Sequence, residues 1–268
     1  MNPLFHKAKL LVFGSLALSI SLAACGVKND ENKGNDGFTY NACNEIGAKI
    51  FGGEECKSDR TAVVRIEGYY RDGSSLSCTG SIISSRAVLT AAHCLVDDPV
   101  VLVVTVDGET FRTADYVVHP GVVYDLFNTV SVFNDVGLVF VGSDLPLSPI
   151  PMLISRNIST GEEGLIAGYG LTENQDLGKL LAGNVIVDRV SSNHIFTAYT
   201  GDNSNPCVGD SGGPLLINDN GVFTIAGTVS SGTPETNCNV GDVTLYANLA
   251  NPEIYSFILD YVPDAAVR

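Results

Sequence analysis

The stretch NPCVGDSGGP, residues 205–214, contains residue types that can perform nucleophilic chemistry. Within it, Ser211 follows an acidic residue and precedes two glycines, which permit a tight turn that exposes backbone N–H groups. Hydrolysis by a serine needs a base that takes the hydroxyl proton, a carboxylate that orients this base, and N–H donors for the oxyanion. The stretch therefore predicts a nucleophile at Ser211, with an ordinary turn serine as the alternative.

The base must be one of four histidines. His93 ends the run LTAAHC, whose small residues and cysteine indicate a strand end held firmly in place. His6 lies in the N-terminal leader, His119 precedes a proline and His194 lies in SSNHIF, so we expect the last two to be structural or exposed. His93 beside a cysteine also fits packing or metal binding, but the histidines lack the ligand spacing of a metal site. We therefore expect His93 to be the base, and no metal or other cofactor.

A carboxylate stands at the start of the apolar run NDVGLVFV, where Asp135 occurs. A carboxylate in such a place is costly to bury unless it is paired. Asp135 is therefore the candidate for orienting the base, and a capping role is the alternative.

The elements that must position these residues are short β-strands. From about residue 60 onward, runs such as TAVVRIEGYY and VFTIAGTVSSG alternate with turns, and Asp107-Gly108 is a hairpin signal. Frequent strands with little helix favour a sandwich or barrels. One helix is expected at about residues 251–262, where Asn251 caps it and an apolar stripe follows at Ile254, Phe257, Ile258 and Tyr261.

Composition limits the class of protein. The chain has 268 residues, is 45% hydrophobic and contains 28 glycines, which is typical of a globular, turn-rich protein. Its formal net charge of −15 argues against a nucleic-acid partner, whose phosphates would repel it. Most of this charge is expected on a solvated surface.

The N-terminus indicates export. Residues 1–24 carry Lys7 and Lys9 before an apolar run that is short for a membrane span, as in a secretory signal peptide. This segment ends in LAAC, residues 22–25, which resembles the cleavage box of bacterial lipoproteins; a plain signal with an incidental cysteine is the alternative. The resemblance implies that Cys25 carries lipid and anchors the chain to a bilayer. Residues 25–49 then form a polar tether, and Gly26 resembles cargo sent to an outer membrane or cell surface, if the organism has an outer membrane.

Together, and in this order, His93, Asp135 and Ser211 resemble the triad of the trypsin/chymotrypsin-like serine proteases. The likeness covers about residues 50–262. It implies a protease domain at residues 50–268 with two six-stranded antiparallel Greek-key β-barrels, at about 50–150 and 151–250, and an active site in the cleft between them. The segments that carry the likeness are IFGGEEC (50–56), CTGSIISSRAVLTAAHC (78–94), DVGL (135–138), PCVGDSGGP (206–214) and VSSG (229–232).

The resemblance also implies roles for individual residues. Ser211 is the expected nucleophile, His93 the base and Asp135 its orienting carboxylate. The N–H groups of Gly209 and Ser211 are the expected oxyanion hole. Ser230 matches a family serine near the triad carboxylate, and the backbone from there to Gly232 is expected to pair with the substrate.

An activation switch is implied as well. Cleavage between Lys49 and Ile50 would free an ammonium group that, in the family, pairs with the acid beside the nucleophile, here Asp210. Leaving one partner of such a buried pair absent costs about 3–5 kcal/mol, enough to keep the oxyanion loop of a precursor disordered. The alternative is that Lys49 is an ordinary tether lysine.

Seven cysteines occur, and six remain if Cys25 takes lipid. An even number suggests disulfides, but spacing alone does not choose among the possible pairings. The resemblance implies Cys78–Cys94 and Cys207–Cys238. Relatives bond the cysteine at position 56 to their second half, but the matching segment here has none, so Cys56 is left to pair with Cys43. That bond would span the Lys49–Ile50 cleavage site and keep the cleaved enzyme attached to its lipidated prosegment.

The expected specificity pocket lacks the aspartate of relatives that cleave after basic residues, because Asn205 occupies that position. A neutral amide does not match the charge of lysine or arginine, so cleavage after those residues is disfavoured; an aspartate or glutamate elsewhere in the pocket that restores it is the alternative. With Gly232 on one wall and Thr244 aligned near the other, an open, polar pocket for a medium apolar, aromatic or amide side chain is expected. Ser231 and Tyr169 stand where tryptophans are common in the family, which affects only the expected packing of substrate.

The sequence therefore predicts a secreted, lipid-anchored, monomeric serine endopeptidase that acts on peptides or proteins and requires an activating protease. A catalytically silent relative that binds a partner is one alternative, although such relatives usually lack a triad residue. A periplasmic or surface esterase is another.

Overall fold

The computed structural model describes residues 54–55, 61–123, 132–172, 174–232 and 238–268. The chain divides into two units, residues 1–37 and 38–268, and all of the described residues belong to the second. Cys25, Cys43, Lys49, Ile50 and Cys56 lie outside the described residues, so the anchor, the activation site and the Cys43–Cys56 bond remain predictions.

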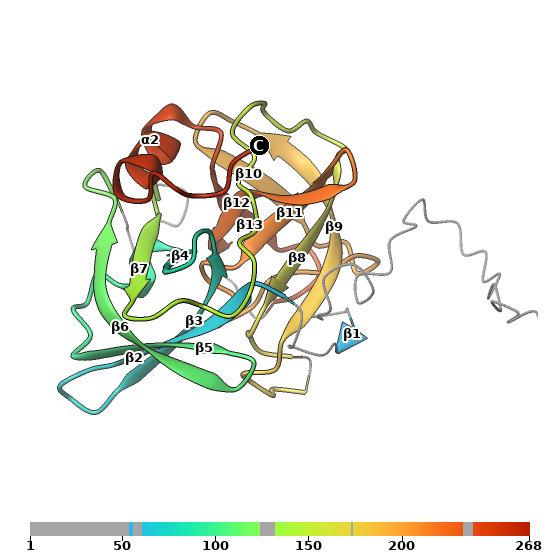
Figure 1. Cartoon of the computed structure of the whole chain (residues 1–268). Coiled ribbons are helices and arrows are strands. Elements are labelled where there is room, and N and C mark those ends of the chain that lie inside the picture. Colours follow the sequence, from blue (N-terminus) through green and yellow to red (C-terminus); the bar gives the residue numbers. More distant parts are fainter. Residues whose placement is uncertain (1–53, 56–60, 124–131, 173, 233–237) are drawn as a thin grey trace, which may run out of the picture. The chain divides into compact units, whose positions relative to one another are not determined.

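The first barrel closes from strands that are all antiparallel to their neighbours, in the order β2-β3-β4-β7-β6-β5 (Figure 1). The predicted hairpin turn lies between β5 and β6, where Asp107 and Gly108 have positive φ angles of 48° and 79°. Both values fit the two-residue turn that suits twisted strands. The strands are β2 (Val63–Tyr69), β3 (Ser75–Ile82), β4 (Ala87–Thr90), β5 (Val101–Val106), β6 (Glu109–Val118) and β7 (Gly137–Val141).

The second barrel closes because its first strand, β8, pairs antiparallel with both β9 and β11. The strands are β8 (Glu163–Gly168), β9 (Leu181–Val190), β10 (His194–Ala198), β11 (Pro214–Asp219), β12 (Val222–Gly232) and β13 (Val243–Asn248). They run in the order β9-β10-β13-β12-β11-β8. The short strand β1 (Glu54–Glu55) pairs antiparallel with β9 of this barrel, although its place in the sequence had suggested the first barrel.

The described residues form three hydrophobic clusters. One lies within each barrel, with side chains such as Ile66 and Val104 in the first and Ile195 and Tyr246 in the second. The third joins the barrels, because Leu89 of β4 shares it with Leu216 of β11. This shared cluster fixes the relative position of the loops that each barrel contributes to the site.

The predicted C-terminal helix is confirmed as α2 (Pro252–Tyr261), and it packs on the cluster that joins the barrels (Figure 1). Its cap is Asn251, whose side chain accepts a hydrogen bond from the Glu253 amide at 3.0 Å. Three positions of the expected apolar stripe are buried, but the fourth, Tyr261, is 53% exposed because it is the last residue of the helix. Among the described residues, no helix has the length and apolar character needed to cross a bilayer.

Candidate active site

The first barrel supplies the histidine and the aspartate from two neighbouring strands. β4 pairs with β7 up to Thr90 and Gly137, and the chain continues past β4 into the short 3₁₀ helix η2 (Ala92–Cys94), which carries His93. Asp135 lies two residues before β7 begins. A disulfide between Cys78 of β3 and Cys94 holds η2 against the barrel. Strand pairing therefore brings two residues far apart in sequence into contact.

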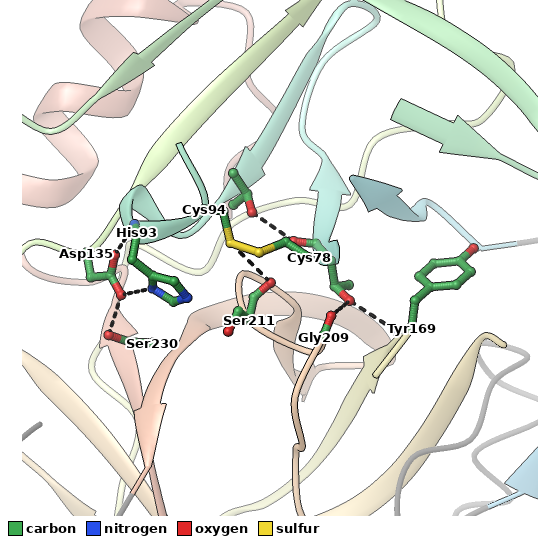
Figure 2. Close-up of a disulfide and its surroundings, with 10 residues drawn as sticks. Cys78, His93, Cys94, Asp135, Tyr169, Gly209, Ser211 and Ser230 are labelled. Carbon is green, nitrogen blue, oxygen red and sulfur yellow. Dashed lines mark hydrogen bonds and ion pairs between the residues drawn. A yellow bond between two sulfur atoms is a disulfide. The ribbon is translucent and has the colours of Figure 1, made fainter. Parts of the chain in front are cut away.

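The Asp135 carboxylate is 1% exposed and accepts three hydrogen bonds. Its Oδ1 accepts from the His93 backbone amide at 2.9 Å, and its Oδ2 lies 2.7 Å from Nδ1 of the same residue. The Ser230 hydroxyl donates to Oδ2 at 2.7 Å (Figure 2). Burial opposes ionisation, but the charge interaction with His93 and these hydrogen bonds outweigh it, and the pKa of Asp135 is lowered. The carboxylate therefore stays charged and fixes the imidazole orientation.

Ser211 comes from the second barrel, on the turn that leads into β11. Its carbonyl accepts from the Thr79 amide at 2.8 Å, which ties this turn to β3 of the first barrel. Figure 2 shows the Ser211 side chain on the side of the His93 ring that faces away from Asp135. The structure thus places His93 against Asp135, and Sγ of the neighbouring Cys94 lies 3.8 Å from the Ser211 carbonyl oxygen.

Two backbone N–H groups beside the hydroxyl, those of Gly209 and Ser211, had been predicted as oxyanion donors. Within the described part of the chain, no acceptor receives a hydrogen bond from either of them. Gly209 has a φ of +99°, and a Cβ built on it would lie 2.9 Å from the Cα of Gly170. Only glycine fits this conformation and this close approach, so the turn keeps its shape only with glycine at this position.

Thr79 was not predicted to be part of the site, yet it holds the nucleophile turn through its side chain as well. Fully buried on β3, it donates from Oγ1 to the Gly209 carbonyl at 2.9 Å and accepts from the Tyr169 amide at 3.0 Å. Its strand reads SLSCTGSI, so Thr79 is one of several hydroxyl-bearing residues and no local signal distinguishes it. The sequence alone does not reveal its partners, which are 130 and 90 residues away along the chain.

Asp210, next to the nucleophile, is 1% exposed and bonds backbone amides of loops in the second barrel. Its Oδ1 accepts from the Gly170 amide and its Oδ2 from the Cys207 amide, each at 2.8 Å. Burial raises the pKa of Asp210 to about 7, against the lowering effect of these two hydrogen bonds. Among the described residues, no lysine, arginine or histidine forms an ion pair with it. The site therefore holds a buried carboxyl group that would gain from a cation.

The predicted pocket residues also lie together. Gly232 of β12 pairs with Thr244 of β13, and the Thr244 hydroxyl donates to Oδ1 of Asn205 at 2.9 Å. Both Asn205 and Thr244 are buried. The Cys207–Cys238 disulfide joins the segment before the nucleophile to the loop that leads into β13. The neutral Asn205 amide is thus buried, six residues before Ser211 in the same loop.

The remaining described histidines are structural, and neither is exposed. His119 lies 3.2 Å from the Glu253 carbonyl through Nε2, and His194 lies 2.6 Å from the Val132 carbonyl through Nε2. Burial lowers the pKa of His194. A cluster of Cys78, His93 and Cys94 has the residue types of a metal site. However, its two cysteines are bonded to each other, so they offer no thiolates to a metal.

Two closed antiparallel barrels with this site at their junction define the chymotrypsin fold. The family model named Trypsin matches residues 50–254. Chymotrypsin-2 of Vespa crabro is 30% identical over 204 residues, which cover 69% of this chain and 87% of that protein. Trypsin eta of Drosophila melanogaster is 28% identical, over 75% of this chain and 85% of its own length.

A solved structure of a collagenase superposes with a TM-score of 0.65 and covers 80% of this chain and 99% of its own, at 22% sequence identity. The chain belongs to the trypsin family of serine endopeptidases. Disulfide-bonded proteins of this kind are typically secreted.

Proposed function

We propose that this protein is an active serine endopeptidase in which Ser211, His93 and Asp135 form the catalytic triad. The observation that carries the proposal is the buried Asp135 carboxylate. It bonds His93 at two places, the backbone amide and the ring nitrogen Nδ1. In this proposal Nε2 of His93 takes the proton of the Ser211 hydroxyl, which lies on the side of the ring away from Asp135 (Figure 2). The charge and hydrogen bonds on Asp135 are those needed to stabilise an imidazolium.

In the proposed mechanism, Ser211 Oγ forms a bond to the carbonyl carbon of the scissile peptide while His93 Nε2 takes its proton. The oxyanion that develops is bound by the N–H groups of Gly209 and Ser211. The tetrahedral intermediate collapses with cleavage of the C–N bond, and the imidazolium gives its proton to the leaving amine. A water molecule then repeats the sequence on the acyl-enzyme and restores the serine. Each oxyanion donor of this kind lowers the barrier by about 2.7–4 kcal/mol.

We further propose that the protein is made as a zymogen. Cleavage between Lys49 and Ile50 creates an α-ammonium group, which pairs with Asp210. The proposal is supported by the burial of Asp210 and by its pKa of about 7, which reflects a carboxyl group lacking a cation. The pair would stabilise the turn that contains Gly209 and Asp210, and with it the oxyanion hole.

The proposed cellular form is an exported lipoprotein. Residues 1–24 direct export, Cys25 carries acyl chains in a bilayer, and residues 26–49 form the tether. The Cys43–Cys56 disulfide keeps this tether attached after activation, so the active enzyme remains anchored. In this proposal the anchor limits the enzyme to peptides or proteins that reach the membrane.

Hydrolysis of a peptide library by protein cleaved at Lys49–Ile50 tests the proposed activity. Wild-type protein should hydrolyse peptide bonds, and Ser211→Ala should lower kcat by about a million-fold. The exposed Ser192→Ala serves as the matched control and should retain activity. A folded, cleaved protein that hydrolyses no peptide but cleaves esters would favour the esterase. One that does neither would favour the silent binding module.

A further inference from the structure

We propose that the pocket closed by Asn205 selects a neutral side chain that ends in a hydrogen-bond acceptor, namely glutamine or asparagine. This side chain belongs to the residue just before the scissile bond. The inference rests on the proposed function and names its substrate class. It follows from the orientation of one buried amide, which Thr244 sets.

The position of this amide relative to the nucleophile follows from the chain connections. From Ser230, whose hydroxyl bonds Asp135, strand β12 continues to Gly232, which pairs with Thr244 on β13. Thr244 bonds Asn205, and the Cys207–Cys238 disulfide joins the two loops that follow. The segment from 205 to 211 then returns to the nucleophile. These links connect Asn205 to the strand that carries Ser230 and to the segment that carries Ser211.

The orientation of the Asn205 amide follows from the hydrogen bond that the Thr244 hydroxyl donates. Thr244 Oγ1 donates to Asn205 Oδ1 at 2.9 Å, and Thr244 is only 4% exposed. The reverse orientation would place Nδ2 against the hydroxyl oxygen and leave the Thr244 proton without an acceptor among the described residues. A buried hydroxyl that loses its acceptor is unfavourable. The oxygen of Asn205 is therefore occupied, and its NH₂ group is turned away from Thr244.

The NH₂ group gives the pocket a donor character. Among the described residues, no oxygen accepts a hydrogen bond from Nδ2 of Asn205. A side-chain carbonyl from a substrate satisfies such donors, whereas an apolar side chain of the same size leaves them buried and unpaired. An asparagine or glutamine side chain supplies this carbonyl without a net charge.

Charged side chains fit the same pocket less well. Lysine and arginine carry only donors, which meet the NH₂ group while the amide oxygen is already engaged. A glutamate carboxylate could accept from Nδ2, but the Asn205 amide carries no charge that would offset the desolvation of an anion. The protein's net charge of −15 also disfavours an anionic substrate.

One consequence concerns activation. The bond to be cleaved in the precursor follows Lys49, a residue that this pocket rejects. The enzyme should therefore not activate itself, and a separate protease with basic specificity must cleave Lys49–Ile50.

The test uses full-length protein cleaved by trypsin and a series of succinyl-Ala-Ala-Pro-X-p-nitroanilides. The series includes near-isosteric pairs, asparagine with leucine and glutamine with methionine, together with glutamate and lysine. Active enzyme is counted by fluorophosphonate labelling of Ser211. We expect the better amide substrate to exceed its apolar partner in kcat/KM by about tenfold or more, with lysine lower still. Uncleaved protein incubated alone should stay uncleaved.

Two isosteric variants locate the cause. Asn205→Leu removes the donors and should reverse the preference within each pair, and Thr244→Val frees the amide and should reduce it. Equal or better cleavage after leucine, methionine or lysine by labelled wild-type enzyme overturns this inference while the proposed function stands. Absence of Ser211 labelling overturns both. If either variant fails to fold, the wild-type profile decides alone.

Discussion

The hydroxyl of Ser230 lies 2.7 Å from Oδ2 of Asp135, so a strand of the second barrel donates a hydrogen bond to the carboxylate of the first. This contact does more than fill space. Burial acts to raise the pKa of Asp135, but the interactions with His93 and this hydrogen bond from Ser230 outweigh it and lower the pKa. The contact also couples the position of the orienting carboxylate to the barrel that carries the nucleophile.

Removing this contact tests its contribution to catalysis. Ser230→Ala should lower kcat by about tenfold, since a hydrogen bond to a charged group contributes about 1.5–3 kcal/mol and part of it is regained by water. KM should change less than kcat. The matched control is Thr228→Val on the same strand, whose buried hydroxyl has no partner among the described residues. Equal effects of the two variants on kcat would contradict the assigned role.

Thr79 predicts a stability effect with a catalytic consequence. Thr79→Val keeps the shape of the side chain but leaves the Gly209 carbonyl and the Tyr169 amide buried without a partner. We expect the free energy of unfolding, measured in urea, to fall by about 1–3 kcal/mol, and kcat to fall because the oxyanion turn is less well held. Thr113→Val, which removes an unpartnered buried hydroxyl of the first barrel, should have little effect. An unchanged kcat in Thr79→Val would contradict the expectation that Thr79 holds the oxyanion turn in its active conformation.

Asp210 predicts a pH dependence for the uncleaved protein. Its pKa is about 7 in the folded state and 3.8 for an ordinary aspartate, so between these values the folded form holds a proton that the unfolded form has lost. Stability should therefore decrease as the pH rises from about 4 to about 7, by up to roughly 4 kcal/mol. Denaturant titrations of wild-type and Asp210→Asn proteins at several pH values isolate this contribution as their difference.

After cleavage the same comparison should give a different result. The new ammonium group keeps Asp210 ionised, so the decrease in stability between pH 4 and 7 should disappear from the wild-type minus variant difference. A difference that stays constant with pH in the uncleaved protein would contradict the assigned state of this carboxyl group.

The predicted Cys43–Cys56 bond gives a direct test of the tether. After cleavage at Lys49–Ile50, the prosegment should stay attached on a non-reducing gel and separate on a reducing gel. In the double variant Cys43→Ser, Cys56→Ser it should separate on both. Release from the wild-type protein without reductant would exclude a disulfide across the cleavage site.

The motif residues could be predicted because their chemistry is local in sequence. The segment around Ser211 and the residues next to His93 and Asp135 identified the family, and family resemblance supplied Ser230. The strands were predicted from short β-type runs separated by turn residues and from the Asp107-Gly108 turn. The helix was predicted from its cap and stripe, except for Tyr261 at its end.

Contacts between residues that are far apart in the sequence were not predicted. Thr79 bonds residues 90 and 130 positions away, and a Cβ on Gly170 would meet the Asp210 carboxylate, so glycine is required there. β1 joins the second barrel although it precedes the first in sequence. In each case the deciding partner comes from another part of the chain, which composition and periodicity do not reveal.

The central claim is that His93 takes the proton of Ser211 while Asp135 holds the ring. Its most direct test is labelling of the cleaved protein with a fluorophosphonate, followed by peptide mapping in a mass spectrometer. The account predicts one adduct on Ser211, formed at least about a thousand-fold more slowly in His93→Ala, because the hydroxyl then lacks its base. Labelling of folded His93→Ala at the wild-type rate, or an adduct on a different residue, would contradict the account.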